Sequence, residues 1–268
     1  MRIYITITEE PMFINPFIKK VIQSIPSDII GIGIVSGSLV NGKSIIKKVE
    51  YLLTIALISG PIELFKRFSL LSRFHLYDKL KFLTHKNPLS ISQVAKEFNI
   101  PVKYVEDVNS QEFLTYLEDI KPDLIINQAQ AILKKDFLSI PTIGCLNRHA
   151  ALLPKYRGRL APFWAYLNME YETGVSIHFI DEKIDNGDIV VQKKIPIEQF
   201  DTFDSLLKKI FSVVPDAMLE AIDIIRSKNY ESNLIKNDPA LATYYSSPAL
   251  KDAIRYRKVM LKRFLNGI

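Results

Sequence analysis

Cysteine and long hydrophobic segments are scarce in this sequence. Cys145 is the only cysteine in 268 residues, which excludes an intramolecular disulfide and a Cys-rich metal site. No signal-type apolar segment behind a charged region opens the chain, so a reducing cytoplasm is the expected location. The longest apolar stretch, Tyr51 to Ile62, is too short to cross a bilayer and contains Gly60 and Pro61 near its end. This pattern favours a buried helix.

The motifs of several large enzyme classes are also missing. The sequence has no P-loop, no His-Glu-x-x-His pair and no internal repeat. The glycine-containing stretch at 31–37, GIGIVSG, does not match the G-x-G-x-x-G fingerprint, because Ser36 stands at the third glycine position. Its glycines also lie inside a predicted strand rather than at a turn. Dinucleotide binding is therefore not expected at this element.

The net charge of +6 is unevenly distributed along the chain. Residues 41–86 and residues 226–268 each hold nine Lys and Arg against three Asp and Glu, so the remaining chain is acidic. Clustered positive charge favours an anionic partner such as a nucleotide diphosphate, RNA or a lipid surface. Two solvated helical faces explain the same pattern equally well.

Alternating strand and helix patterns predict an α/β fold. Strand-like runs at 2–8 and 28–37 enclose a helical run at 16–25, which is a βαβ opening. Further strands are predicted at 101–107, 122–128, 143–150, 173–181 and 187–197, and further helices at 90–100, 110–120, 161–170 and 202–228. The helix at 90–100 has Ser90 or Ser92 near its cap, and the last helix is expected to bend near Pro215.

This pattern predicts a Rossmann-like, mostly parallel twisted sheet with helices on both faces. We expect a main domain at residues 1–225 that contains a basic helical insertion at about 41–86. A small basic C-terminal extension is expected at residues 226–268.

The stretch from Leu146 to Gly158, LNRHAALLPKYRG, contains the strongest candidate site. Side chains two residues apart on a strand share a face, so Asn147 and His149 should project together at the carboxyl end of a strand, where open α/β sheets build their sites. Asp185 precedes an Asn-Gly pair that favours a tight turn, which predicts a carboxylate at a hairpin tip. Each feature alone also fits a satisfied polar pair or an ordinary turn residue.

Together these residues closely resemble the folate-dependent formyltransferases, the family of methionyl-tRNA formyltransferase, glycinamide ribonucleotide formyltransferase and the sugar N-formyltransferases. The resemblance rests on an N-x-H-x-S-L-L-P-x-Y-R-G block, a G-V-[ST]-I-H strand and an L-D-x-G-D turn, and it covers roughly Ser90 to Ile225. Ala151 stands where the family usually has serine, and Ile184 replaces a frequent leucine.

The resemblance implies that Asn147, His149 and Asp185 are catalytic. Formyl transfer from N10-formyltetrahydrofolate to an amine passes through a tetrahedral adduct whose oxygen becomes negative. An Asn147 amide and a histidine N–H can donate to that oxygen, and one such donor contributes about 3 kcal/mol. His149 can accept or relay the amine proton, while Asp185 orients the ring or holds a water molecule. Neither a metal nor a covalent enzyme intermediate is required.

The resemblance also implies that the pterin of the donor lies against residues 127–133 and the loop that leads to Asp185. The donor-binding residues predicted in this way are Gln128, Ala129, Gln130, Ala131, Ile132 and Ile184. From the residues alone, the two glutamines could equally be solvated. His178 is interpreted as a structural residue, and His75 and His85 as surface residues.

The expected acceptor is a nucleotide-linked amino sugar of cell-surface polysaccharide synthesis. The segment at residues 226–268 is shorter than the RNA-binding domain that methionyl-tRNA formyltransferases normally append, which disfavours a tRNA acceptor. Glycinamide ribonucleotide formyltransferases lack both basic segments. Arg157 or the basic C-terminal segment would suit a diphosphate, and aromatic side chains would stack on a base or sugar, although Trp164 also fits a core helix. The predicted acceptor-binding residues are Arg157, Gly158, Trp164, Tyr244 and Tyr245.

Several alternatives stay open. Methionyl-tRNA formyltransferase and formyltetrahydrofolate deformylase would use the same three catalytic residues, and a non-enzymatic folate or nucleotide sensor would not need them. The basic amphipathic stretch at 61–83 could lie weakly on an anionic membrane. Packing onto the domain or onto a second copy in a homodimer is the preferred interpretation of that stretch. Nucleic acid is not an expected partner.

Overall fold

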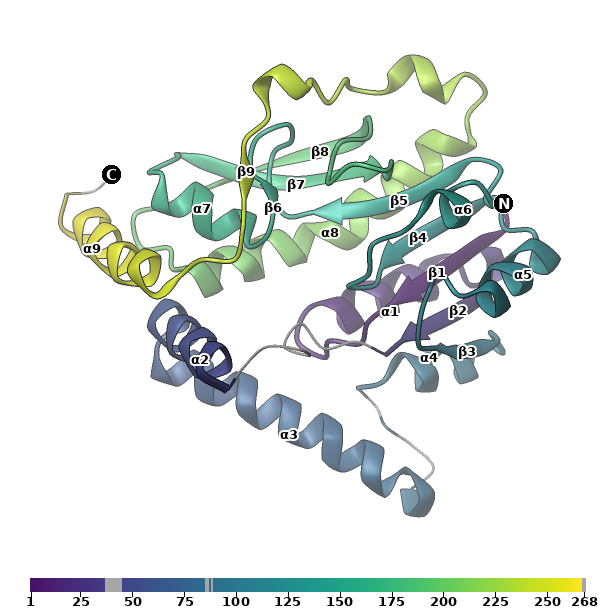
Figure 1. Ribbon diagram of the computed structural model, residues 1–268, viewed down its shortest axis with the longest axis horizontal. Helices are drawn as coiled ribbons and strands as arrows, with labels where there is room; N and C mark the ends of the chain where they lie inside the picture. The colour runs from purple at the N-terminus through teal and green to yellow at the C-terminus, as the bar shows by residue number, and fades with distance from the viewer. Residues whose placement is uncertain (37–44, 85–86, 88, 267–268) are drawn as a thin grey trace.

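A seven-stranded sheet forms the centre of the protein (Figure 1). The computed structural model describes residues 1–36, 45–84, 87 and 89–266. The strand order is β3-β2-β1-β4-β5-β7-β8, in which β1 to β5 pair in parallel and β7 and β8 are added antiparallel. The seven strands are β1 (Ile3–Ile7), β2 (Ile29–Val35), β3 (Val102–Val105), β4 (Leu124–Gln128), β5 (Gly144–His149), β7 (Glu172–Phe179) and β8 (Ile189–Pro196). The predicted mostly parallel sheet is confirmed.

Helices cover both faces of the sheet, as predicted. They are α1 (Ile14–Ser24), α2 (Ile45–Ser59), α3 (Pro61–Thr84), α4 (Ile91–Glu97), α5 (Gln111–Ile120), α6 (Lys135–Leu138), α7 (Ala161–Leu167), α8 (Phe203–Arg226) and α9 (Leu250–Asn266). Ile3, Ile5 and Ile7 of β1 point into the larger core, which α1, α4 and α8 complete. Tyr4 points to the opposite face and packs in a second core with Phe113 of α5. This alternation follows from the two-residue repeat of a strand that is buried on both faces.

The helix boundaries follow the capping signals of the sequence. The Ser90 hydroxyl accepts the Ser92 N–H at the start of α4, and Thr202 and Ser205 form a reciprocal capping box at the start of α8. The structure describes α8 as one helix that includes Pro215, the residue at which a bend was predicted.

Helices α2 and α3 form most of the basic insertion, of which residues 41–44 and 85–86 lie outside the described residues. Figure 1 shows α3 running along the side of the sheet domain. The prediction of a buried helix at 51–62 is only half right. Thr54 and Ile58 of α2 are buried, whereas Leu52, Leu53 and Leu57 are exposed, because only one side of α2 packs on the protein. In the part of the chain that the structure describes, no helix is long and apolar enough to span a membrane.

The C-terminal segment is part of the same core. Strand β9 (Tyr244–Tyr245) pairs in parallel with β6 (Arg157–Gly158) to form a two-stranded sheet. Helix α9 packs against α2 and α7, and its side chains Ala253 and Tyr256 are fully buried. The Arg257 Nε–H donates to the Leu57 carbonyl of α2. The basic extension therefore holds the insertion against the body.

Candidate active site

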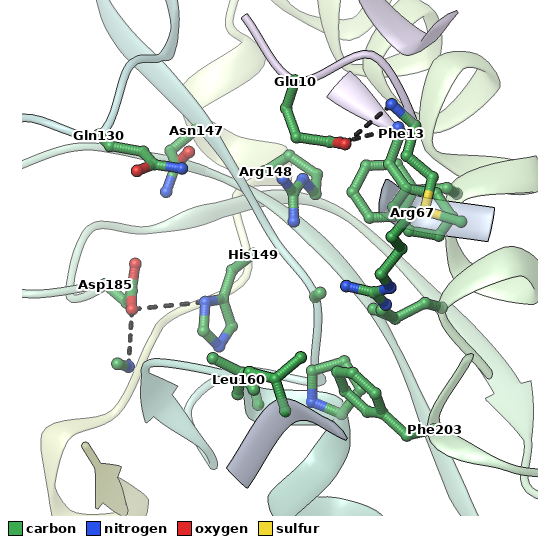
Figure 2. A pocket seen from close by; sticks show the side chains of 18 of the residues that line it. Glu10, Phe13, Arg67, Gln130, Asn147, Arg148, His149, Leu160, Asp185 and Phe203 are labelled. Atoms are coloured by element: carbon green, nitrogen blue, oxygen red, sulfur yellow. Dashed lines mark hydrogen bonds and ion pairs between the residues drawn. The ribbon is translucent and has the colours of Figure 1, made fainter. Parts of the chain in front are cut away.

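The structure brings Asn147, His149 and Asp185 together at the end of β5. Asn147 and His149 are the last alternating residues of that strand, and Asp185 lies in the connection between β7 and β8 (Figure 2). The antiparallel register of β5 with β7 places His178 directly opposite Asn147. Because opposite residues project to the same face, His178 joins the cluster.

His149 is held in one orientation by a backbone group. Its Nε2 lies 2.8 Å from the Tyr156 carbonyl oxygen, which can only accept, so Nε2 carries the proton. Nδ1 then keeps its lone pair in the neutral ring and lies 3.4 Å from Asp185 Oδ2. Burial lowers the pKa of His149, although Asp185 opposes this shift. The neutral ring is thus a base at neutral pH, and the carboxylate would stabilise a proton gained on Nδ1.

Asp185 is fixed by a close contact between β6 and β9. Its Oδ2 accepts the Gly158 N–H over 2.9 Å, while the carboxylate is largely buried. Gly158 has a φ of +99°, and a Cβ at that position would lie 2.2 Å from the Tyr245 carbonyl oxygen. Only glycine fits this approach. The position of the carboxylate therefore depends on how closely these two short strands lie.

Asn147 is oriented by its neighbour Gln128. The Gln128 Nε2–H donates to Asn147 Oδ1 over 3.2 Å, which turns the Asn147 Nδ2 donors away from Gln128. Asn147 Nδ2 lies 3.5 Å from His178 Nε2, and the His178 Nδ1–H donates to the Phe179 carbonyl over 2.7 Å. Burial lowers the pKa of His178 to about 4, so this ring is neutral as well. The site thus combines an amide donor with two neutral imidazoles.

Two cavities meet at this cluster, and a third adjoins both of them. The large cavity, of about 630 Å³, lies between the end of β5, helix α8 and helices α2 and α3, and Figure 2 shows its lining. The loop cavity, of about 370 Å³, lies between residues 127–133 and residues 180–185. The bridging cavity, of about 450 Å³, shares lining residues with both of the others. Asn147 and Asp185 line both the large cavity and the loop cavity, so a group bound on one side can reach a group bound on the other.

The residues predicted for donor binding fall into two sets. Four of them line the loop cavity, namely Ala129, Ala131, Ile132 and Ile184. Gln130 instead lines the large and bridging cavities. The buried Gln128 lines none of these three cavities and touches the site through Asn147 and Arg148. Its contacts in the structure are those of a residue that positions the Asn147 amide, and its role in donor binding stays a prediction.

The residues predicted for acceptor binding mostly lie elsewhere. Arg157 is fully buried, and its guanidinium donates to Asn186, Asn237 and the Tyr244 hydroxyl, which leaves it enclosed by protein groups. Trp164 and Tyr245 stack on each other with ring centroids 4.8 Å apart. Neither these two rings nor Tyr244 lines any of the three cavities, so the structure does not support their predicted roles. Gly158 does line the large cavity, beside Asp185.

Several lining residues were not identified from the sequence. The large cavity is mostly apolar because Phe13, Phe211 and side chains of α2 and α3 enclose it, and Arg148 adds a positive charge. In the sequence, only the position of Arg148 between Asn147 and His149 indicated that it could belong to the site. His178 was interpreted as structural, and only the register of β5 with β7 reveals its place in the site. His75 is exposed, as predicted, and His85 lies outside the described residues.

A family comparison identifies the chain. The model of the family described as "Formyl transferase" matches residues 78–222, which is more than half of the sequence. The chain belongs to the formyl transferase family. The match includes all of β5, the β7–β8 connection and the cluster of Asn147, His149 and Asp185.

Relatives within the formyl transferase family differ in the acceptor that their names state. A methionyl-tRNA formyltransferase of Kosmotoga olearia is 37% identical over 191 residues, which cover 70% of this chain and 61% of that relative. The chain thus matches less than two thirds of that relative's length. Among solved structures, a phosphoribosylglycinamide formyltransferase of Bacillus halodurans has a TM-score of 0.57 at 18% identity and covers 85% of this chain and 96% of its own. A sugar N-formyltransferase of a Shewanella species has a TM-score of 0.54 at 15% identity and covers 97% and 87%. These structural similarities show a shared fold.

Proposed function

We propose that the protein transfers a formyl group from N10-formyltetrahydrofolate to the primary amine of a small acceptor. The observation that carries this proposal is the position of Asn147, His149 and Asp185, which lie where the large cavity meets the loop cavity. The two cavities share the amide of Asn147 and the carboxylate of Asp185, and the base His149 lines the large cavity beside them. This arrangement suits a transfer between two bound molecules. Membership of the formyl transferase family supports the same chemistry.

The donor fits the loop cavity. Ala129 and Ala131 leave room for a flat ring system, and Leu133 and Ile180 add apolar contacts. Asn147 and Asp185 stand at the end of the cavity that adjoins the large cavity. When bound, N10-formyltetrahydrofolate supplies the formyl carbon, whose oxygen becomes negative as the amine adds to it.

The three side chains have separate tasks in this proposal. Asn147 Nδ2 donates to the negative oxygen, and Gln128 keeps that amide correctly turned. His149 accepts the proton of the amine on Nδ1, because Nε2 already donates to the Tyr156 carbonyl. The His149 N–H is therefore not available to the negative oxygen, and Asn147 is the donor in this proposal. Asp185 stabilises the resulting imidazolium, and its 3.4 Å separation from Nδ1 shortens once the proton is there. The imidazolium then returns this proton to N10 as the bond between the formyl carbon and N10 breaks, and tetrahydrofolate leaves.

The acceptor that we propose is a nucleotide-linked amino sugar. A cavity of about 630 Å³ is in the range of small-molecule sites. The adjoining bridging cavity adds Gln130, Arg159 and Ser247, which are polar groups for the remainder of an elongated acceptor. A cavity of this size beside the donor is not needed by a deformylase, whose second substrate is water.

Methionyl-tRNA is the second candidate acceptor. The apolar lining of the large cavity, with Phe13, Phe211 and Leu70, would also suit an aminoacyl side chain. The Kosmotoga olearia relative is named for this substrate. Helices α2 and α3 expose apolar side chains, among them Leu53 and Phe65. Contact with a membrane surface and formation of a homodimer therefore stay further predictions.

The experiment has two parts. Thermal unfolding with saturating 5-formyltetrahydrofolate should show a clear increase in Tm, because a ligand that binds only the folded state stabilises it; an unchanged Tm would contradict the donor site. Formyl transfer to dTDP-, UDP- and GDP-linked amino sugars should then be compared with transfer to methionyl-tRNA and glycinamide ribonucleotide. A preference for either of the last two would reject the sugar acceptor, and formate release without any amine would indicate a deformylase.

A further inference from the structure

Arg148 occupies an unusual position for a charged side chain. It is the β5 residue between Asn147 and His149, so its side chain leaves the strand on the opposite face from theirs. It lines both the large cavity and the bridging cavity, and Figure 2 shows it among the side chains that surround the large cavity. A cation is thus built into the boundary between two cavities of the proposed acceptor site.

The guanidinium of Arg148 is incompletely satisfied. One Nη2–H donates to Gln128 Oε1 over 3.2 Å, and the guanidinium carbon lies 4.6 Å from the ring centroid of Phe211. Its Nε is buried and has no hydrogen-bond partner among the described residues. Burial lowers the pKa of Arg148 to about 10, which still leaves it charged at neutral pH. A partly buried cation in this state gains stability when an anion pairs with it.

The two acidic residues that line the large cavity, Glu10 and Asp185, already have other partners, and so does Asp204 beside Arg67. The Glu10 carboxylate accepts the backbone N–H groups of Met12, Phe13 and Ile14, and thereby caps α1. Asp204 pairs with Arg67 over 2.6 Å across the large cavity wall. Asp185 is engaged with Gly158 and His149, as described above. The structure therefore provides no hydrogen-bonded carboxylate for Arg148 within its described residues.

We propose that Arg148 binds an anionic group of the acceptor, a phosphate or a carboxylate, and so determines which amines the site accepts. This inference rests on the proposed formyl transfer. Arg159, which is exposed and lines the bridging cavity, supplies a second guanidinium on the same side. With the anion held there, the amine end of the acceptor extends past Gly158 to His149 Nδ1.

The glutamyl carboxylate of the folate donor is the other source of such an anion, because the bridging cavity shares Ala129, Ala131 and Ile132 with the loop cavity. The two sources predict different binding losses. A contact with the acceptor leaves folate binding unchanged when Arg148 is replaced. A contact with the donor weakens it.

The test uses Arg148→Met, which keeps the length and the contact with Phe211, and Arg148→Lys, which keeps the charge. Calorimetric titration at physiological salt measures inorganic pyrophosphate, malonate and 5-formyltetrahydrofolate as separate probes. Arg148→Met should lower the affinity for whichever anion the wild-type protein binds by about tenfold or more, because a hydrogen bond to a charged group is removed. Arg148→Lys should lose less. Arg226→Met, a surface arginine paired with Asp28, is the control for long-range charge and should change this affinity by less than about twofold.

Stability provides a readout that does not depend on any ligand. Arg148→Met should keep or raise the Tm of the free protein, because a partly buried charge that has no hydrogen-bonded carboxylate among the described residues is removed. Arg67→Met should lower it, because Asp204 loses its partner.

Each outcome decides the proposal. Pyrophosphate binding supports a phosphate-bearing acceptor, malonate binding supports a carboxylate-bearing one, and binding of neither overturns the inference. A lower Tm of Arg148→Met with unchanged anion affinity would make Arg148 structural, and weaker binding of 5-formyltetrahydrofolate would assign it to the donor. If wild type fails to bind 5-formyltetrahydrofolate, the proposed function itself fails, whatever the anions do.

Discussion

Replacing Gly158 by alanine tests whether the contact between β6 and β9 holds the proposed catalytic carboxylate. The Gly158 N–H donates to Asp185 Oδ2 over 2.9 Å, and its φ is +99°. An alanine Cβ would lie 2.2 Å from the Tyr245 carbonyl oxygen, whereas ordinary contacts begin near 3.4 Å, so the two strands must separate by roughly 1.2 Å. That movement carries the N–H away from Asp185 and stretches the Arg159 N–H···Tyr245 O hydrogen bond, now 2.9 Å.

The expected loss of activity follows from this displacement. A misplacement of about 1 Å in a catalytic arrangement lowers the rate by about 100-fold. We therefore expect Gly158→Ala to lower kcat for formyl transfer by that factor, measured as tetrahydrofolate formation at saturating donor and acceptor. Backbone strain of about 1–3 kcal/mol and one weakened hydrogen bond of about 1 kcal/mol should also reduce the free energy of unfolding. Urea denaturation measures this second effect.

Gly60→Ala is the matched control. Gly60 also has a positive φ, of +80°, but an added Cβ would meet only the end of the flexible Arg257 side chain, at 3.1 Å. This variant should lose about 1 kcal/mol of stability and keep kcat within about threefold. If Gly158→Ala remains folded and keeps a wild-type kcat, the close approach of β6 to β9 does not position Asp185.

Three further predictions concern the titratable groups. His149→Ala and Asp185→Asn should each lower kcat at least about 100-fold without unfolding the protein, because both groups act on the transferred proton; near-normal turnover in either variant would reject its role. Because burial lowers the pKa of His149 below 6.5, kcat/KM should decrease only at more acidic pH, and a His149-dependent midpoint above 6.5 would contradict this environment. For His178, the unfolded chain takes up a proton near pH 6.5 and the folded chain near pH 4. Its contribution to stability is therefore complete above pH 6.5 and is lost as the pH falls to about 4. Urea denaturation across this range should show a smaller decline for His178→Gln, and an equal decline would exclude His178 as the cause.

The fold could be predicted from local patterns because its strands are long apolar runs. The segments around Ile3–Ile7 and Leu124–Gln128 are buried on both faces, and such strands require helices on both sides. The pairing of Asn147 with His149 followed from the two-residue repeat. These features depend on neighbours in the sequence. The tight turn predicted at Asn186-Gly187 is wrong, because residues 180–188 connect β7 to β8 and the positive φ, of +47°, lies at Asp185.

The acceptor side of the site could not be predicted in the same way, because it depends on contacts between distant segments. Arg157 looked like a free cation in the sequence, but Asn237 and Tyr244, about eighty residues later, enclose it. Trp164 meets Tyr245 for the same reason. His178 enters the site only through the register of an antiparallel pair, which local sequence does not specify. Tertiary packing, rather than composition, decided which of these side chains remain available to a ligand.

One wall of the large cavity depends on a helix that is synthesised late, because α2 packs against α9. Tyr51 and Ile55 of α2 line that cavity, yet α2 rests on a helix that begins at Leu250. On the ribosome, β1 to β5 and the residues that line the loop cavity emerge before α9. The wall made by α2 must wait for the last helix described here. The residues of the loop cavity are therefore all synthesised before the helix that supports this wall of the large cavity.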